Sequence, residues 1–148
     1  MDDHQKCRLH SAMKPFLGYC FYKSAANLKE RMDESVKPLG LVIQQCGILT
    51  ILEVLGNLSQ TELAEQLEMD TTSVVRFIDG LEKKKYVERI ADPKDRRVRM
   101  LHLTPAGQKA LAEVRKVGRE AEEKFLSPLS AEERKAIRSI VPKLITEG

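Results

Sequence analysis

Tryptophan is absent from the 148 residues, and cysteine and histidine occur only three times each. The cysteines, Cys7, Cys20 and Cys46, are odd in number and widely spaced, which excludes a fully paired disulfide framework and favours a reducing compartment. No apolar run approaches the roughly 20 residues that a membrane-spanning helix needs. The polar first residues do not resemble a signal peptide. We therefore expect a cytoplasmic protein with no membrane partner.

Catalytic groups are also sparse. The sequence has no Ser/His/Asp or Cys/His constellation and no phosphate-binding glycine loop, and its scattered histidines offer no obvious general base. His4, Cys7 and His10 are spaced by threes like metal ligands, but such steps spread the groups around a helix axis, and the segment is terminal. We expect no enzyme activity, no cofactor and no bound metal.

The chain is instead rich in helix-forming residues, which favours a mainly α fold. Its formal net charge is only +3, yet residues 83–99 carry eight Lys or Arg against three Asp or Glu. Positive charge is therefore concentrated in one segment, and the function must account for it.

Hydrophobic periodicity predicts helices over residues 11–36 and 42–55, then a short helix from Gln60 and another from about residue 71 to 84. Ser59, with Glu62 three residues later, has the spacing of a capping box, and Asp70 or Thr71 caps the next helix. Two short helices joined by a tight turn form a helix-turn-helix.

After Lys85 the pattern changes to two short alternating segments, YVERIA and VRMLHLT, separated by the turn signal DPKD. This predicts a β-hairpin wing, so the fold class is mainly α with a small β-hairpin wing. Thr104 and Pro105 then begin a long helix, and Ser130 caps a last one that Pro142 kinks. The long helix carries a seam at steps of three and four: Leu111, Val114, Gly118, Ala121 and Phe125.

In a helix-turn-helix the second helix enters the major groove of DNA with its first residues at the base edges. The basic hairpin tip suits the narrow minor groove, with Arg97 inserted and Asp95 pairing with a neighbouring guanidinium. Other basic residues and the preceding helix start are expected to reach phosphates. The complete set of expected DNA contacts is Ser59, Gln60, Thr61, Thr71, Thr72, Ser73, Arg76, Lys83, Lys84, Arg89, Lys94, Asp95, Arg96 and Arg97.

Simpler interpretations exist for the same residues. A run of charge on a hairpin is commonly a solvated face, and Ser or Thr at a helix start is commonly a cap. A winged helix that has lost DNA binding and serves as a protein-interaction module is the alternative class. The order of a polar-headed helix followed by a basic hairpin favours DNA binding, because both features belong to one docking geometry.

The stretch from Leu58 to Gly107 resembles the MarR family of bacterial transcription regulators. The resemblance is carried by the helix VVRFIDGLEKK, by YVER at the first wing strand, by DPKDRR at the tip and by LTPAG. It implies a symmetric dimer on a pseudo-palindromic operator, usually as a repressor. It assigns Asp95 and Arg97 to the family's wing Asp-x-Arg positions and residues 73–76 to the recognition-helix core. Two departures are Lys85, where the family often has Gly, and Val75, where it often has Thr or Ser.

The resemblance also implies a division of the chain. Residues 1–40 and 105–148 are the expected dimerisation helices, and residues 41–104 are the expected winged helix-turn-helix lobe. The seam on the long helix lacks another partner in so small a chain, which favours the homodimer. A small effector, often aromatic or phenolic in this family, is expected in a cleft. The residues expected to line it, which fit a hydrophobic core equally well, are Phe16, Tyr19, Cys20, Ile43 and Gly47.

Cys20 also resembles the reactive cysteine of the family's organic-hydroperoxide sensors, since Phe21 follows it and Asn27 lies nearby. Those proteins activate the thiol with tyrosines from the second helix, whereas Ile43 and Cys46 occupy the matching places here. A redox-sensing regulator acting through Cys20, with or without a Cys20–Cys46 disulfide, is therefore an alternative to effector release. Inert packing of Cys20 on the apolar stripe is the simpler interpretation.

Overall fold

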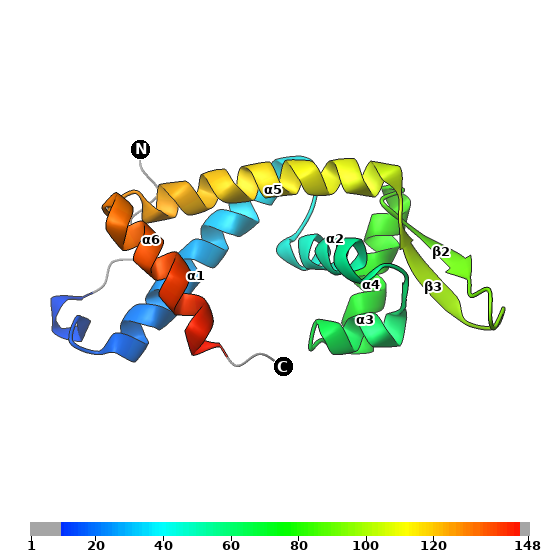
Figure 1. The fold of residues 1–148 in the computed structure, drawn as a ribbon, viewed down its shortest axis with the longest axis horizontal. Coiled ribbons are helices and arrows are strands. Elements are labelled where there is room, and N and C mark those ends of the chain that lie inside the picture. Colours follow the sequence, from blue (N-terminus) through cyan, green and yellow to red (C-terminus); the bar gives the residue numbers. More distant parts are fainter. Residues whose placement is uncertain (1–9, 146–148) are drawn as a thin grey trace. The chain divides into compact units, whose positions relative to one another are not determined.

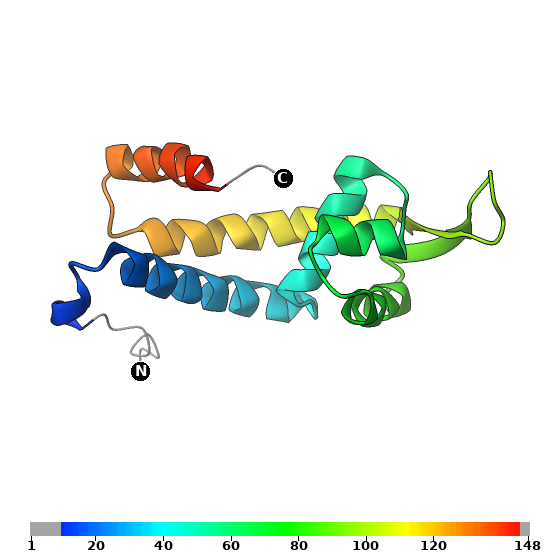
Figure 2. The same ribbon diagram turned by 90° about the horizontal axis from the view of Figure 1, so that it is seen from below.

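The computed structural model describes residues 10–145 and divides the chain into two compact units (Figures 1 and 2). The winged lobe is Asp33–Gly118. The helical unit is Met1–Met32 with Arg119–Gly148, of which the structure describes residues 10–32 and 119–145. The elements run in the order η2 (Ser11–Met13), α1 (Leu17–Val36), η3 (Lys37–Leu39), α2 (Ile43–Leu55), β1 (Leu58–Ser59), α3 (Gln60–Gln66), α4 (Thr71–Lys83), β2 (Val87–Ala91), β3 (Arg99–Leu103), α5 (Pro105–Leu126), α6 (Ala131–Ile140) and η4 (Val141–Leu144).

The helix-turn-helix is formed by α3 and α4, as the sequence predicts. Ser59 and Glu62 form the expected capping box, in which the Ser59 backbone N–H donates to the Glu62 carboxylate at 2.8 Å. Asp70, rather than Thr71, caps α4 by accepting from the Ser73 backbone N–H at 2.8 Å. The inner face of α4 is fully enclosed, because Val74, Ile78 and Leu81 are completely buried.

The wing is part of a three-stranded antiparallel sheet with the strand order β1-β3-β2, not the isolated two-stranded hairpin that the sequence predicts. In β1, Leu58 pairs with Leu101 and Ser59 with Met100. The main ladder between β2 and β3 runs from Val87 opposite Leu103 to the wing tip. The β2–β3 hairpin projects away from α2, α3 and α4 (Figures 1 and 2). Because β1 directly precedes α3, this third strand holds the start of α3 beside the middle of β3.

The junction between wing and α5 is held by Thr104 and Gly107. The Thr104 hydroxyl donates to the Lys85 carbonyl at 2.7 Å and accepts from the Gly107 backbone N–H at 3.0 Å. Thr104 therefore caps α5 as predicted. Lys85 has a φ of +60°, the left-handed conformation that glycine adopts at the least steric cost.

One hydrophobic core holds the winged lobe together, and it includes residues of α5. Leu111 is fully buried and Val114 nearly so among side chains of α2, α3, α4 and the sheet. Arg115, on the same helix, pairs with Glu53 of α2. The expectation that the whole α5 seam lacks a partner within the chain is therefore wrong: its first two residues belong to the protomer's own core.

The helical unit contains the first part of α1, the end of α5, α6 and η4. The expected helix from residue 11 is interrupted, because Pro15 has no backbone N–H to continue the ladder, and α1 begins at Leu17. Ser130 and Glu133 form the second predicted capping box, and Pro142 ends α6 in the 3-10 turn η4.

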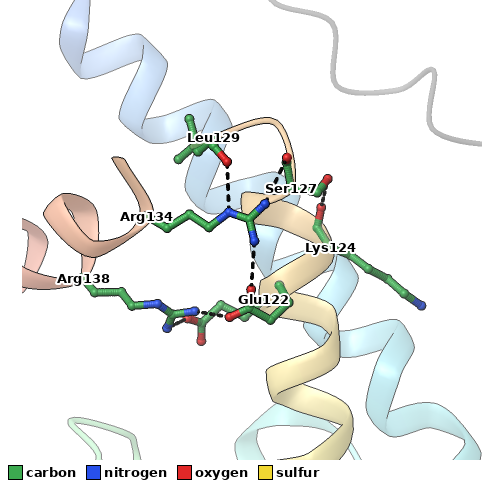
Figure 3. Close-up of polar contacts among 7 residues, drawn as sticks. Glu122, Lys124, Ser127, Leu129, Arg134 and Arg138 are labelled. Atoms are coloured by element: carbon green, nitrogen blue, oxygen red, sulfur yellow. Dashed lines mark hydrogen bonds and ion pairs between the residues drawn. The ribbon is translucent and has the colours of Figure 1, made fainter. Parts of the chain in front are cut away.

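Two arginines of α6 fix the corner with α5 (Figure 3). Arg134 donates from Nε to the Leu129 carbonyl at 3.0 Å and from Nη2 to the Ser127 carbonyl at 3.2 Å. Arg138 pairs with Glu122 and Glu123 near the end of α5. The Arg134 bonds satisfy carbonyl groups of the turn between α5 and α6, and the Arg138 pairs link the two helices within the unit.

Within residues 10–145, no single helix is both long and apolar enough to cross a membrane. The consecutive helices Leu17–Leu39 and Ile43–Leu55 satisfy that requirement only when they are taken together across the bend that separates them.

Candidate nucleic-acid interface

The first turn of α4 presents polar side chains that the fold leaves available. Thr71 and Thr72 are exposed and Ser73 is half-buried, while Asp70 supplies the cap. Hydrogen bonds from Ser73 lower the pKa of the Asp70 carboxyl, so the cap is ionised at neutral pH. Because Asp70 already caps the helix, the hydroxyl groups of Thr71 and Thr72 are not required for capping and can face a ligand.

Arg76 lies one turn further along α4 and is exposed. Its guanidinium carbon lies 5.5 Å from the centre of the Phe77 ring, a cation–π distance. Val75, beside it, is half-buried. Stacking on Phe77 restricts the long Arg76 side chain without using its hydrogen-bond donors, which remain available for a planar acceptor such as a guanine edge.

The start of α3 is less available than the sequence predicts. The Ser59 hydroxyl donates to the Glu62 carboxylate at 2.8 Å and accepts from the Glu62 backbone N–H at 3.3 Å. The bonds that the Ser59 backbone N–H and then the Ser59 hydroxyl donate to the Glu62 carboxylate lower the pKa of that carboxyl and keep it charged. The Ser59 side chain thus already serves as a cap, and its expected contact with phosphate stays a prediction. Thr61 is exposed, and Gln60 is half-buried.

The wing tip is organised by two aspartates that bind backbone rather than arginine side chains. Asp92 accepts from the Lys94 backbone N–H at 2.8 Å, and Asp95 accepts from the Arg97 backbone N–H at 3.0 Å. The predicted pairing of Asp95 with a guanidinium is thus wrong. Both aspartates form short side-chain-to-backbone turns, which shape the tip and leave the arginine side chains unconstrained by it.

The basic residues at and near the wing tip are exposed and, among residues 10–145, make no ion pair within the chain. They are Lys94, Arg96, Arg97 and Arg99 on the wing, with Lys83 and Lys84 at the end of α4. A cluster of exposed cations without internal carboxylate partners produces a positive surface potential and a site for anionic ligands.

Arg89 differs from the other basic residues of this segment. Its side chain is 23% exposed and pairs with Asp79 at 2.7 Å and with Glu82, both on α4. It also donates to the Gln60 side chain from Nε at 3.2 Å and from Nη2 at 3.0 Å. The expectation that Arg89 contacts phosphate did not foresee these partners, which occupy all three of its nitrogen atoms.

The predicted effector residues are distributed over both units. Phe16, Tyr19 and Cys20 belong to the helical unit, where Phe16 is exposed and the other two are half-buried. Ile43 and Gly47 lie on α2, and Ile43 packs against the core of the winged lobe. The core interpretation therefore applies to Ile43, and the effector site stays a prediction.

The two described cysteines are free thiols with different surroundings. Burial raises the pKa of the Cys46 thiol to about 11, so Cys46 is protonated and unreactive at neutral pH. Cys20 is half-buried, and its Sγ lies 3.6 Å from the Lys14 carbonyl. Among residues 10–145 no group of three or more His, Cys, Asp or Glu side chains is placed to hold a metal ion; His4 and Cys7 lie outside the described residues.

The sequence did not reveal one polar residue that joins two helices behind the interface. Gln45 on α2 is nearly buried, accepts from the Val42 backbone N–H at 3.2 Å and donates to the Phe77 carbonyl on α4 at 3.3 Å. The only available signal was the polar pair Gln44 and Gln45 at the start of a mostly apolar helix. The partners of Arg89 left a clearer signal, because Asp79 and Glu82 are three residues apart and therefore share a helix face.

Comparison with known proteins shows which family the chain resembles. The MarR family model matches residues 41–98. The chain is 32% identical over 117 residues to the HTH-type transcriptional repressor MdtR of Bacillus subtilis, covering 79% of this chain and 76% of that protein. It is 34% identical over 101 residues to a putative transcriptional regulatory protein for the hcr operon of Thauera aromatica, covering 66% of this chain and 61% of that protein.

A solved structure agrees with these sequence matches. A MarR family protein of Mycobacterium tuberculosis, in complex with DNA, superposes with a TM-score of 0.78 at 25% identity, covering 88% of this chain and 98% of that one. The winged helix-turn-helix, the wing motif and these relatives lead to one conclusion: the chain belongs to the MarR family and is a winged-helix transcriptional regulator.

Proposed function

We propose that the protein is a homodimeric repressor that binds a pseudo-palindromic DNA operator, with α4 in the major groove and the wing in the minor groove. The main support for the proposal is that some polar side chains of this surface form caps and turns while their neighbours stay exposed. Ser59, Asp70 and Asp95 are consumed by capping and turn formation, whereas Thr71, Thr72 and Arg76 on α4 and Arg96 and Arg97 on the wing stay available. The exposed set combines base-reading donors with cations for phosphate, as DNA recognition requires.

The DNA-bound relative from Mycobacterium tuberculosis supports the nucleic-acid partner, and the relative named as a repressor supports the direction of regulation. Val75 at the centre of the first turns of α4 suits an apolar contact such as a thymine methyl group. Arg97 suits the narrow minor groove, where the negative potential is concentrated. The protein then acts in the cytoplasm, where its operator lies.

The homodimer is supported by apolar side chains that the protomer leaves exposed in its helical unit. Leu17 is 68% exposed and Leu144 is 65% exposed, and Phe16, Tyr22 and Ile140 are more than half exposed. Large apolar groups gathered in this way indicate a protein partner. A second copy of the chain is the partner that fits, since two-fold symmetry places two recognition helices roughly 34 Å apart, one turn of DNA.

A small aromatic or phenolic effector that releases the protein from DNA completes the proposal. It rests on the family resemblance and on the half-buried Tyr19. Redox control through Cys20 is the alternative means of release.

Selection from a random pool of duplexes tests the proposal without knowledge of the target genes. The expected result is enrichment of inverted repeats whose half-sites are centred about 10 base pairs apart. Enrichment of single half-sites would contradict the dimer, and failure to enrich any sequence above the starting pool would contradict specific DNA binding.

A further inference from the structure

Arg89 lies in the middle of β2, but its side chain joins the three elements of the proposed DNA-binding surface. It originates on the wing, pairs with Asp79 and Glu82 of α4 and donates to Gln60 at the start of α3. Asp79 and Glu82 lie on one face of α4, and the planar guanidinium spans them as a single fork. No other side chain in the described range 10–145 makes hydrogen bonds to both α3 and α4 from the wing.

The charge balance at this junction argues against a direct role in DNA binding. One guanidinium faces two carboxylates, so the cluster carries a net negative charge. A phosphate would have to displace carboxylates that already hold Arg89 with charge-assisted hydrogen bonds. Arg96, Arg97 and Lys94 have no such competitors and are exposed, whereas Arg89 is largely covered.

We propose that Arg89 is a positioning residue that fixes the angle between the wing and the recognition helix α4, and that it does not contact phosphate. This inference rests on the proposed function, because the fixed angle matters only if wing and helix bind adjacent grooves of one duplex. The base of the wing is already joined to α4 by residues 84–86 and by the shared core of α4 and the sheet, and the Arg89 bonds add a polar link farther out on β2. A wing held in place before binding avoids the entropic penalty of ordering it on DNA.

The direction in which one double substitution changes the DNA affinity distinguishes a positioning role of Arg89 from a purely electrostatic effect. Asp79→Ala/Glu82→Ala removes two negative charges from the DNA-binding lobe, and both positions suit alanine in a helix. If only charge mattered, the variant would bind DNA more tightly than the wild-type protein. If Arg89 positions the wing, the variant should bind DNA about tenfold more weakly, because the wing loses its polar link to α4.

A mutant cycle on DNA affinity then tests whether Arg89 acts through these carboxylates. Arg89→Met is introduced into the wild-type protein and into Asp79→Ala/Glu82→Ala, and affinity is measured on a labelled duplex recovered from the random pool. We expect Arg89→Met to weaken binding about tenfold in the wild-type background and less than about threefold in the variant background. Equal losses in both backgrounds would overturn the proposal, since a phosphate contact does not depend on Asp79 and Glu82. Unchanged affinity of Arg89→Met, or tighter binding by Asp79→Ala/Glu82→Ala, would also overturn it.

A measurement on the free protein distinguishes failure of this inference from failure of the proposed function. Amide hydrogen exchange of Asp92 and Val98 reports on wing order without DNA, because the Asp92 N–H donates to the Val98 carbonyl and the Val98 N–H donates to the Asp95 carbonyl. Arg89→Met is expected to accelerate exchange in the wing while the core amides of α2 stay protected. Unchanged wing exchange would overturn the inference even if DNA binding is confirmed. Faster wing exchange in Arg89→Met, combined with a wild-type protein that enriches no duplex, would instead contradict the proposed function alone.

Discussion

The side-chain amide of Gln45 on α2 donates to the backbone carbonyl of Phe77 on α4, at 3.3 Å. The carbonyl belongs to the residue on whose ring Arg76 rests, so α2 is tied to the recognition helix directly behind its exposed face. The contact is possible because residue 80 is glycine. A β-carbon at Gly80 would lie 2.6 Å from Gln45 Nε2.

Gly80→Ala is therefore expected to lower the free energy of unfolding by about 1–3 kcal/mol. Alanine improves helix propensity, but Gln45 is nearly buried, and moving its amide breaks the bond to Phe77. Chemical denaturation measures the change. The same substitution in a Gln45→Ala background should be much less damaging, and stabilisation by Gly80→Ala alone would show that α2 and α4 do not meet in this way.

Gly107→Ala should be more damaging than Gly80→Ala. A β-carbon there would lie 2.1 Å from the Tyr86 carbonyl oxygen, which is backbone and cannot rotate away. Since the same carbonyl accepts from Thr104, the junction between wing and α5 must shift. We expect a loss of about 3 kcal/mol in the free energy of unfolding. A thermal melt that matches the wild-type protein would contradict the structure of this junction.

Lys85→Gly is expected to stabilise the protein. Lys85 adopts a left-handed backbone at φ +60°, which strains any residue with a β-carbon. Glycine relieves the strain but loses more entropy on folding, so the expected net gain is about 0.5–1 kcal/mol. Denaturant titration checks the sign, with Lys84→Gly as the matched control, since Lys84 is in the right-handed region and should be destabilised instead.

Arg97→Ala should weaken operator binding without unfolding the protein. The side chain is exposed and the tip is shaped by the Arg97 backbone N–H, which alanine retains. We expect about tenfold weaker binding, with the free energy of unfolding within about 0.5 kcal/mol of the wild-type value. Lys116→Ala removes the same charge from an exposed site on α5 and serves as the control. Equal effects of both variants would mean that the wing has no specific role.

Acid should weaken the helix-turn-helix through its caps. Hydrogen bonds from Ser59 and Ser73 lower the pKa values of Glu62 and Asp70 in the folded state. Groups with lowered pKa values stabilise the fold fully above their unfolded values, near pH 4, and lose that effect as the pH falls through the folded values. Unfolding free energies measured between pH 6 and pH 3 should therefore decline less in Glu62→Gln/Asp70→Asn than in the wild-type protein. An equal decline would exclude these caps as the cause.

The caps, the hairpin and the helix order could be predicted because each depends on residues close together in the sequence. Ser59 and Glu62 are three residues apart, and Asp92, Pro93 and Asp95 indicate the wing turn. The strand β1 could not be predicted, since two residues have no detectable period and its pairing to Leu101 joins distant parts of the chain.

The other errors have a common physical cause. A repeat of three and four on α5 looks the same whether Leu111 and Val114 face a second protomer or the protein's own core, and the structure places them in the core. Likewise, Arg89 and Arg97 are equivalent as sequence letters. Only the fold brings Gln60, which is 29 residues away, to the guanidinium of Arg89 and leaves Arg97 exposed.

Fluorescence anisotropy measures whether the exposed residues on α4 and the wing bind DNA specifically. A labelled duplex from the gene's own upstream region, or one recovered from the random pool, is titrated with protein at several salt concentrations and with excess unrelated duplex. We expect saturable binding that survives the competitor and weakens steeply as salt rises, because Lys and Arg neutralise phosphates. Binding no tighter than to the unrelated duplex, for both labelled sequences, would contradict specific DNA binding and favour a protein partner for the wing.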